Sequence, residues 1–136
     1  MKKIPKKKKV KRSLLVKKLD AIFSKYIRLR GADEFGFTNC WTCGKRDHYL
    51  SQQAGHFQSR RHYSTRWDET NVQVQCCSCN VFKSGEQFLF GKYLDERIGD
   101  GTSEELYYKS KEMVKYSDDD LIELTTYYKS IVDTVI

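Results

Sequence analysis

Residues 71–80 read NVQVQCCSCN, and the fold that we expect is organised around this stretch. It contains a Cys-x-x-Cys pair, Cys76 and Cys79. Asn71 stands five residues before the pair, and Asn80 follows it directly. Thiolates suit zinc, whereas an amide oxygen suits a hard cation such as Mg²⁺. The stretch therefore combines residues that could hold a structural metal with residues that could take part in chemistry.

An upstream pair completes a set of four thiols in two Cys-x-x-Cys pairs. Each pair can present both of its sulfurs to one tetrahedral Zn²⁺. The N-terminus is basic but has no apolar segment that could direct export, so a metal is favoured over disulfides. We therefore predict a structural zinc site made of Cys40, Cys43, Cys76 and Cys79. Cys77 lacks the two-residue spacing and is left out.

Charge is distributed unevenly along the 136 residues, whose net charge is +7. Residues 1–12 hold eight Lys or Arg and no acid, residues 13–94 carry a net charge of +5, and residues 95–136 carry −6. This asymmetry suits a polyanionic partner, although ordinary surface charge explains the same distribution. We expect residues 1–12 to form a flexible basic arm that serves either DNA contact or nuclear import.

The length favours one domain after the arm, over residues 13–136. Short strands are expected near residues 53–57 and 71–75, with helices before and after them. A helical pattern also follows Cys79 and ends by Gly99. The N-terminal helix has an apolar stripe at helical spacing, made of Leu15, Leu19, Ile22, Phe23, Tyr26 and Ile27. Ser13 and Ser117 are the expected N-caps of the first and last helices. The predicted parts are an N-terminal helix over 13–31, a zinc-containing core over 38–99 and C-terminal helices over 102–136, which together make an α+β fold.

Membrane insertion and secretion are not expected. No run of about 18 apolar residues is present, so no segment predicts a membrane span. The absence of an apolar signal core also argues against secretion. We expect the protein to be intracellular, in the cytoplasm, or in the nucleus if the cell is eukaryotic.

Three polar residues around the cysteines fit metal-assisted phosphodiester hydrolysis. A neutral imidazole at His56 could take a proton from water near neutral pH. The amide oxygen of Asn80 could bind Mg²⁺, at a position fixed by the neighbouring zinc ligand. The side chain of Asn71 could hydrogen-bond the loop of the active site and hold His56 in orientation. We predict these three residues as the catalytic set.

Basic side chains between and after the cysteine pairs could grip the phosphates of DNA. Such contacts fix position and make affinity salt-dependent, but they do not read the base sequence. Arg66 is the predicted neighbour of the scissile phosphate. The predicted DNA-binding residues are Arg60, Arg61, Arg66 and Lys83.

The order of these motifs resembles the HNH, or His-Me finger, endonucleases. Their pattern is a Cys-x-x-Cys pair, a histidine, an Asn followed by a hydrophobic residue, and a second Cys-x-x-Cys pair followed by His or Asn. A narrower likeness is to the phage NinG (Rap) recombination proteins, over roughly residues 20–100. It rests on Ala54-Gly55-His56-Phe57, Arg66-Trp67-Asp68-Glu69-x-Asn71-Val72, Gln75-Cys76-x-x-Cys79-Asn80 and Lys83-Ser84-Gly85.

The resemblance implies a zinc-stabilised treble-clef core of the ββα-metal type with flanking α-helices. It implies a Mg²⁺-dependent endonuclease, with Mn²⁺ as an alternative metal, that acts on Holliday junctions and other branched DNA. A four-way junction needs two symmetric cuts, so a homodimer is expected, with the tyrosine-rich C-terminal helices as its interface. Alternatives are an HNH nuclease that cuts duplex DNA without junction preference, and a non-catalytic zinc module that binds DNA or protein.

One position departs from many HNH enzymes, which place Asp or His as a metal ligand before the catalytic histidine. Here that residue is Gly55, as it is in the NinG pattern. Asn80 is therefore expected to be the main protein ligand of the catalytic metal. Asp68, Glu69 or Glu86 could assist it.

Overall fold

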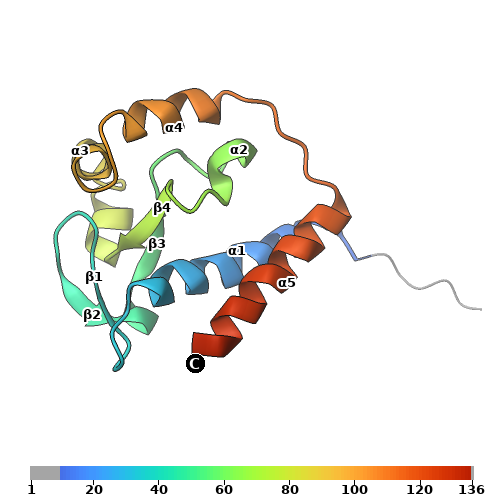
Figure 1. The fold of residues 1–136 in the computed structure, drawn as a ribbon, viewed down its shortest axis with the longest axis horizontal. Coiled ribbons are helices and arrows are strands. Elements are labelled where there is room, and N and C mark those ends of the chain that lie inside the picture. Colours follow the sequence, from blue (N-terminus) through green and yellow to red (C-terminus); the bar gives the residue numbers. More distant parts are fainter. Residues whose placement is uncertain (1–9, 136) are drawn as a thin grey trace, which may run out of the picture.

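A β-hairpin from the middle of the chain lies between two groups of helices (Figure 1). The computed structural model describes residues 10–135, with α1 and α5 on one side of the hairpin and α3 and α4 on the other. Strand pairing is antiparallel in two small sheets, β1–β2 and β3–β4. This arrangement confirms the predicted α+β class.

The elements are α1 (Arg12–Arg30), β1 (Phe37–Asn39), β2 (Arg46–His48), the 3-10 turn η1 (Tyr49–Ser51), β3 (Gln53–His56), α2 (Tyr63–Arg66), β4 (Val72–Gln75), the π-helical turn η2 (Ser78–Phe82), α3 (Gln87–Arg97), α4 (Thr102–Ser110) and α5 (Asp118–Val135).

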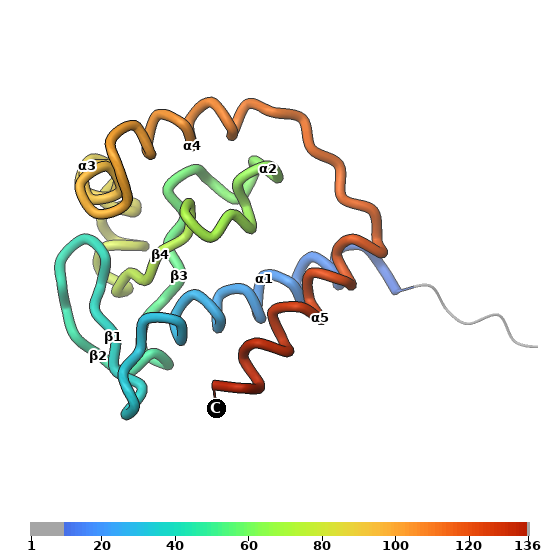
Figure 2. The backbone as a smooth tube through the Cα atoms, in the orientation of Figure 1, coloured from blue at the N-terminus to red at the C-terminus, as the bar shows by residue number. Residues whose placement is uncertain are grey.

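Helix α1 forms the main core with α5 and the β3–β4 hairpin. Leu15, Leu19, Phe23 and Ile27 recur every four residues, so they form one buried stripe along the helix. Helix α5 runs beside α1 in the same direction, as Figure 2 shows. Tyr128 of α5 packs edge-on against Phe23, with the ring centroids 5.0 Å apart. The apolar stripe predicted for the N-terminal helix is confirmed.

The start of α1 differs from the prediction. The helix begins at Arg12, so Ser13 lies inside its first turn and is not the N-cap. The N-cap position is Lys11, whose side chain makes no capping hydrogen bond. Instead, a guanidinium nitrogen of Arg12 lies 3.1 Å from a carboxylate oxygen of Asp118 at the start of α5. A tertiary ion pair therefore holds the start of α1, where a local cap was expected. Residues 1–9 of the predicted arm lie outside the described residues.

The last helix begins as predicted, with a reciprocal cap. The Oγ of Ser117 accepts a hydrogen bond from the backbone N–H of Asp120 at 3.0 Å. The Asp120 carboxylate accepts one from the backbone N–H of Ser117 at 2.8 Å. This capping box satisfies two backbone donors that the first turn leaves without partners. Within residues 10–135, no helix is both long enough and apolar enough to cross a membrane.

The β1–β2 hairpin was not predicted from the sequence. Its strands have three residues each, and β2 reads Arg-Asp-His, so no apolar alternation marks it. The turn between the strands carries Cys40 and Cys43, and Gly44 closes it with a φ of +78°. Glycine adopts this left-handed conformation without the steric cost of a Cβ. The hairpin thus forms the knuckle that presents the first cysteine pair.

The β3–β4 hairpin matches the two predicted strands. Ala54 pairs with Val74 and His56 with Val72, so these four residues share one face of the hairpin. That face packs on α1 through the two valines and Ala54. The opposite face carries Gln53, Gly55, Gln73 and Gln75. Within residues 10–135, β4 is the only strand that pairs with β3, which leaves the other edge of β3 free.

The helix predicted to run from Cys79 to Gly99 is interrupted. The turn η2 ends at Phe82, and α3 begins only at Gln87. Ser84, Gly85 and Glu86 between them all have positive φ values. The buried amide of Gln75 donates a hydrogen bond to the Gly85 carbonyl at 2.8 Å. The break thus gives the buried Gln75 Nε2 a hydrogen-bond acceptor. Helical periodicity in the sequence does not reveal such a tertiary contact.

We expect Gly55→Ala to destabilise the fold. A Cβ at this position would lie 1.8 Å from Oε1 of the buried Gln75 side chain, so the hairpin or the glutamine must move. Overpacking of this kind costs about 1–3 kcal/mol, measurable as a shift of the urea midpoint of the zinc-loaded protein. Gly31→Ala is the matched control, since its Cβ would meet only Thr38 Oγ1, at 3.9 Å. Equal midpoints for both variants would contradict the prediction.

Candidate functional site

Four cysteine sulfurs meet at one point. The Sγ atoms of Cys40, Cys43, Cys76 and Cys79 all lie within 4.8 Å of one another. The Cys43 and Cys76 sulfurs are 3.6 Å apart. A tetrahedral ion with Zn–S bonds of about 2.3 Å requires sulfurs about 3.8 Å apart, so the cluster fits Zn²⁺. The four cysteines could therefore hold a zinc ion, as their spacing predicts, and Cys77 is exposed and outside the group.

The two hairpins bring these thiols together. One pair sits in the β1–β2 turn, and the other joins the end of β4 to η2. The backbone N–H of Trp41, inside the first knuckle, donates to the Val74 carbonyl of β4 at 2.7 Å. In the second knuckle, the backbone N–H of Cys79 donates to the Cys76 sulfur at 3.4 Å. Backbone hydrogen bonds thus fix the cluster beside the β3–β4 hairpin.

His56, at the end of β3, has a defined protonation pattern. Its Nε2 lies 2.9 Å from the backbone carbonyl oxygen of Arg66. A carbonyl only accepts, so Nε2 carries the proton and the neutral ring keeps the lone pair of Nδ1. Among the described residues, Nδ1 has no hydrogen-bond partner. Burial lowers the pKa of His56 to about 4, with the hydrogen bond to Arg66 acting in the opposite direction. The ring is therefore a neutral base at physiological pH.

Asn80, in η2, offers an amide oxygen. Its Nδ2 donates to Oε1 of Gln53 at 2.8 Å, which fixes the orientation of the amide. Within the described part of the chain, its Oδ1 has no hydrogen-bond partner. An oriented amide oxygen of this kind is a suitable ligand for Mg²⁺.

His56 and Asn80 line the same cavity, which has a volume of about 730 Å³. It runs along the free edge of β3, between α1 and the break that precedes α3. Arg28 and Arg60 also line it and supply positive charge. Asp20 is the one carboxylate among its lining residues. The cavity thus combines a base, an amide oxygen and two cations, a set suited to a phosphate ester.

Asn71 holds the loop that follows His56. Its side chain is fully buried, with Oδ1 accepting from the backbone N–H of Gln58 at 2.7 Å. Its Nδ2 donates to the carbonyls of Gln58 and Thr65, at 3.0 Å each. Asn71 does not itself line the cavity. These contacts fix the loop that follows His56, and the catalytic part assigned to Asn71 stays a prediction.

The four predicted DNA-binding residues occupy different environments. Arg60 is exposed and lines the cavity, whereas Arg61 and Lys83 are exposed outside it. The guanidinium of Arg66 is bound by the carboxylate of Asp20, with N–O distances of 3.0 and 2.5 Å. Arg66 is therefore engaged inside the protein, and it does not line the cavity beside His56.

Of the acids suggested to assist Asn80, Asp68 and Glu69 lie away from the cavity, whereas Glu86 stands between two lining residues, Gly85 and Gln87, and is not itself part of the lining. Asp68 binds Lys109 at 2.5 Å, and Glu69 accepts hydrogen bonds from Tyr26 and Tyr128. The sequence interpretation did not single out Asp20, which is the one acid within α1. A single carboxylate in an otherwise basic helix was the signal that could have identified it.

We expect Cys79→Ser to lose zinc and to lower the melting temperature strongly. Removing one thiolate leaves three sulfurs, and a structural zinc site contributes on the order of several kcal/mol to folding. The measurements are zinc content per chain and thermal unfolding. Cys77→Ser is the matched control, because Cys77 is exposed and outside the cluster. Equal zinc content in the two variants would refute the assigned ligand set.

We expect the His56 ring to remain neutral between pH 8 and pH 5. Its pKa in the fold is about 4 because of burial, below the ordinary value of 6.5. Between pH 6.5 and about pH 4, His56 binds a proton in the unfolded chain but not in the fold. The free energy of unfolding therefore falls as the pH drops through this range. NMR titration of the zinc-loaded protein, with His56→Gln to assign the ring resonance, provides the measurement. A midpoint near 6.5 would contradict the burial argument.

Comparison with protein families adds a finding independent of this geometry. The family model described as Bacteriophage Lambda NinG protein matches residues 1–135. Searches of curated proteins and of solved structures each found no match. The match covers nearly the whole chain, including both cysteine pairs and the residues around the cavity. The chain therefore belongs to the bacteriophage lambda NinG family of phage recombination proteins.

Proposed function

We propose that this protein is a metal-dependent endonuclease of the HNH type that cuts branched DNA during phage recombination, inside the host cell. The observation that carries the proposal is the shared cavity of His56 and Asn80 beside a cluster of four cysteines. Membership of the NinG family supports the recombination context. In this proposal residues 13–136 act as one nuclease domain.

The order of elements supports a treble-clef core of the ββα-metal type. A hairpin with the first cysteine pair precedes the β3–β4 hairpin, and the second cysteine pair opens the helical segment that follows. The histidine ends the first strand of the central hairpin, and Asn80 lies in the turn after the second cysteine pair. This order matches the motif order expected of an HNH nuclease.

Hydrolysis would begin at His56. Its Nδ1 lone pair takes a proton from a water molecule, whose oxygen attacks phosphorus and displaces the 3′ oxygen of the neighbouring nucleotide. The Nε2–H bond to the Arg66 carbonyl keeps Nδ1 as the basic atom. Mg²⁺ or Mn²⁺ held by Asn80 Oδ1 would supply positive charge to the phosphate and the leaving oxygen. The products would carry 5′-phosphate and 3′-hydroxyl ends.

Cations around the cavity would hold the DNA backbone. Arg28 and Arg60 line the cavity. Arg61 and Lys83 are exposed, and each is the chain neighbour of a lining residue. Contacts to phosphates give binding that weakens with salt and does not depend on base sequence. Such contacts fit a substrate recognised by its shape. Recognition would then rest on branch geometry.

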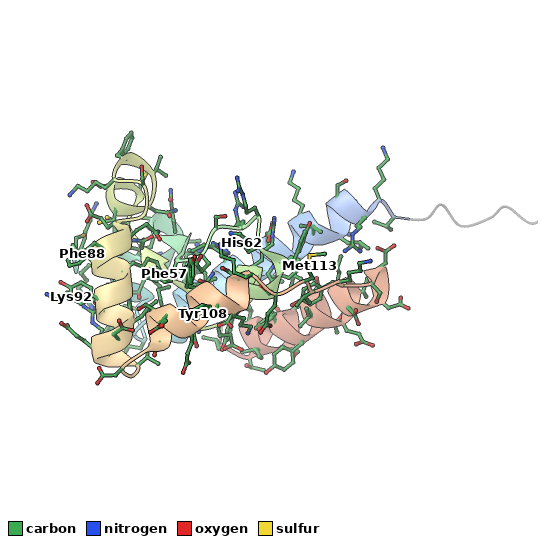
Figure 3. All side chains as sticks on the ribbon, turned by 90° about the horizontal axis from the view of Figure 1, so that it is seen from above. Phe57, His62, Phe88, Lys92, Tyr108 and Met113 are labelled. Carbon is green, nitrogen blue, oxygen red and sulfur yellow. The ribbon has the colours of Figure 1, made fainter. Side chains whose placement is uncertain are left out.

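Two exposed phenylalanines favour a substrate in which base stacking is interrupted. Phe82 and Phe88 each keep 81% of their surface exposed, which is unusual for large apolar side chains. Phe82 lies two residues after Asn80, and Phe88 directly follows Gln87 of the cavity lining. Figure 3 shows Phe88 and Lys92 along the outer side of α3. Aromatic rings stack on free base faces, which a DNA branch can expose where stacking is interrupted and which the interior of a linear duplex does not expose.

A two-fold dimer would place two such sites on two of the four strands of a junction. Helix α5 leaves Ile122 and Tyr127 about half exposed, while Tyr128 faces the core. The exposed side of α5 is the proposed contact between subunits. This placement keeps the cavity along β3 free for DNA.

We expect His56→Ala and Asn80→Ala to lose cleavage of a four-way junction in Mg²⁺ while keeping zinc and fold. Loss of a general base costs about 10²–10⁴-fold in rate. His62→Ala is the matched control, since His62 lies in the same loop but outside the cavity lining. Single-turnover cleavage of a labelled junction provides the measurement. Full cleavage by His56→Ala would rule out His56 as the general base, whereas no cleavage by the wild type would support a non-catalytic zinc module.

We expect Phe82→Ala and Phe88→Ala to weaken junction binding more than duplex binding. Base stacking on an aromatic ring is worth about 1–3 kcal/mol per base. Affinities for a junction and for its separate linear arms, measured at one salt concentration, provide the comparison. Lys83→Ala is the control, because loss of a phosphate contact should weaken both substrates alike. Equal cleavage of junction and linear arms by the wild type would favour a duplex nuclease.

A further inference from the structure

We propose that Asp20, on α1, is a positioning residue that fixes the protonation pattern of His56 through Arg66. The catalytic consequence rests on the proposed function, whereas the positioning itself does not. Asp20 lies outside the segment that carries the cysteines and His56. The proposal therefore assigns the N-terminal helix a part in the site as well as in the core.

The first step is the contact between Asp20 and Arg66. Nε of Arg66 donates to Oδ1 of Asp20 at 3.0 Å, and Nη2 donates to Oδ2 at 2.5 Å. Nε1 of Trp67 also donates to Oδ1, at 3.0 Å. The two-bond arrangement fixes the guanidinium in both direction and plane. Only 21% of the Asp20 side chain and 15% of the Arg66 side chain are exposed, so solvent screens this pair less than a surface pair.

Arg66 contacts His56 through its backbone carbonyl, which accepts the Nε2–H of the imidazole. The Nη1 of the Arg66 side chain donates to the Arg60 carbonyl at 2.8 Å. Helix α2 has four residues and ends at Arg66. So short a helix has little stability of its own, and an anchor outside it is needed to hold its last carbonyl. The Asp20 carboxylate, carried by a 19-residue helix packed into the core, supplies that anchor.

Asp20 also lines the cavity, so a role as metal ligand is the competing explanation. Its oxygens already accept three hydrogen bonds from Arg66 and Trp67. Metal binding would have to displace one of them or share an occupied oxygen. The observed contacts therefore favour positioning, and the two roles differ in their response to Mg²⁺ concentration.

The direct test is the Nε2–H proton of His56 in zinc-loaded protein without DNA or Mg²⁺. A proton donated to a carbonyl in a partly buried site exchanges slowly enough to give an NMR resonance, which His56→Ala identifies by its absence. We expect the resonance in the wild type and its loss in Asp20→Asn, whose amide N–H₂ would face the Arg66 donor. Asp118→Asn is the matched control, since it removes the other Arg–Asp pair between α1 and the rest of the chain. A retained resonance in Asp20→Asn overturns the proposal.

Junction cleavage provides the second readout. We expect kcat to fall about 10–100-fold in Asp20→Asn, with KM for DNA and the Mg²⁺ dependence unchanged. Asp20→Glu should recover part of the rate because it restores the carboxylate. A requirement for much more Mg²⁺ in Asp20→Asn overturns positioning in favour of metal binding.

Zinc content and melting temperature show whether the variant folds. If Asp20→Asn does not fold, Arg66→Lys makes the same test, because lysine keeps the charge but lacks the two-bond fork. We expect that variant to lose the resonance too, and its retention overturns the proposal. If the resonance behaves as expected but no form of the protein cleaves DNA, positioning stands and the proposed nuclease function fails.

Discussion

The meeting of four cysteine sulfurs is the constraint on which the rest of the site depends. The β1–β2 and β3–β4 hairpins have short strands, and the two sheets do not pair with each other. Two-stranded hairpins of this size are marginal alone in water. A metal bound by both knuckles would fix one hairpin against the other and set the position of Asn80, which follows Cys79 directly. The geometry of the cysteine cluster and the position of Asn80 are thus linked through one turn of the chain.

A second constraint is the packing of α1 against the central hairpin. One face of the hairpin packs on α1 through Val72 and Val74, and His56 ends that same face. The helix that buries the core therefore also forms one wall of the cavity, through Asp20 and Arg28. Burial by this wall keeps the pKa of His56 low, and the Arg66 carbonyl selects its protonated nitrogen. Packing and chemistry depend on the same contacts.

The local part of this arrangement could be predicted from the sequence. The cysteine spacing predicted the cluster, alternating residues predicted β3 and β4, and the four-residue period predicted the stripe of α1. Asn71 does contact the loop after His56, whereas its catalytic role stays a prediction. Each of these features is encoded over a few neighbouring residues, where spacing and periodicity are informative.

Features that depend on distant partners could not be predicted in this way. Arg66 was expected beside a phosphate, but it pairs with Asp20, 46 residues away in the sequence. The helix after Cys79 is broken where Gly85 accepts a hydrogen bond from the buried Gln75. Gly55, first interpreted as a missing metal ligand, faces that same glutamine, which leaves no room for a Cβ. In each case a tertiary contact overrides the local preference of the sequence.

The central claim is that His56 activates water for attack on a phosphodiester. Single-turnover cleavage of a four-way junction in ¹⁸O-labelled water, with zinc-loaded protein and Mg²⁺, tests it most directly. Mass spectrometry of the strands cut by the wild type is predicted to show one ¹⁸O atom in a new 5′-phosphate, beside an unlabelled 3′-hydroxyl end, and His56→Ala is predicted to leave the DNA intact. Product ends without the label, intact DNA with the wild type, or labelled products formed equally fast by His56→Ala would contradict the claim.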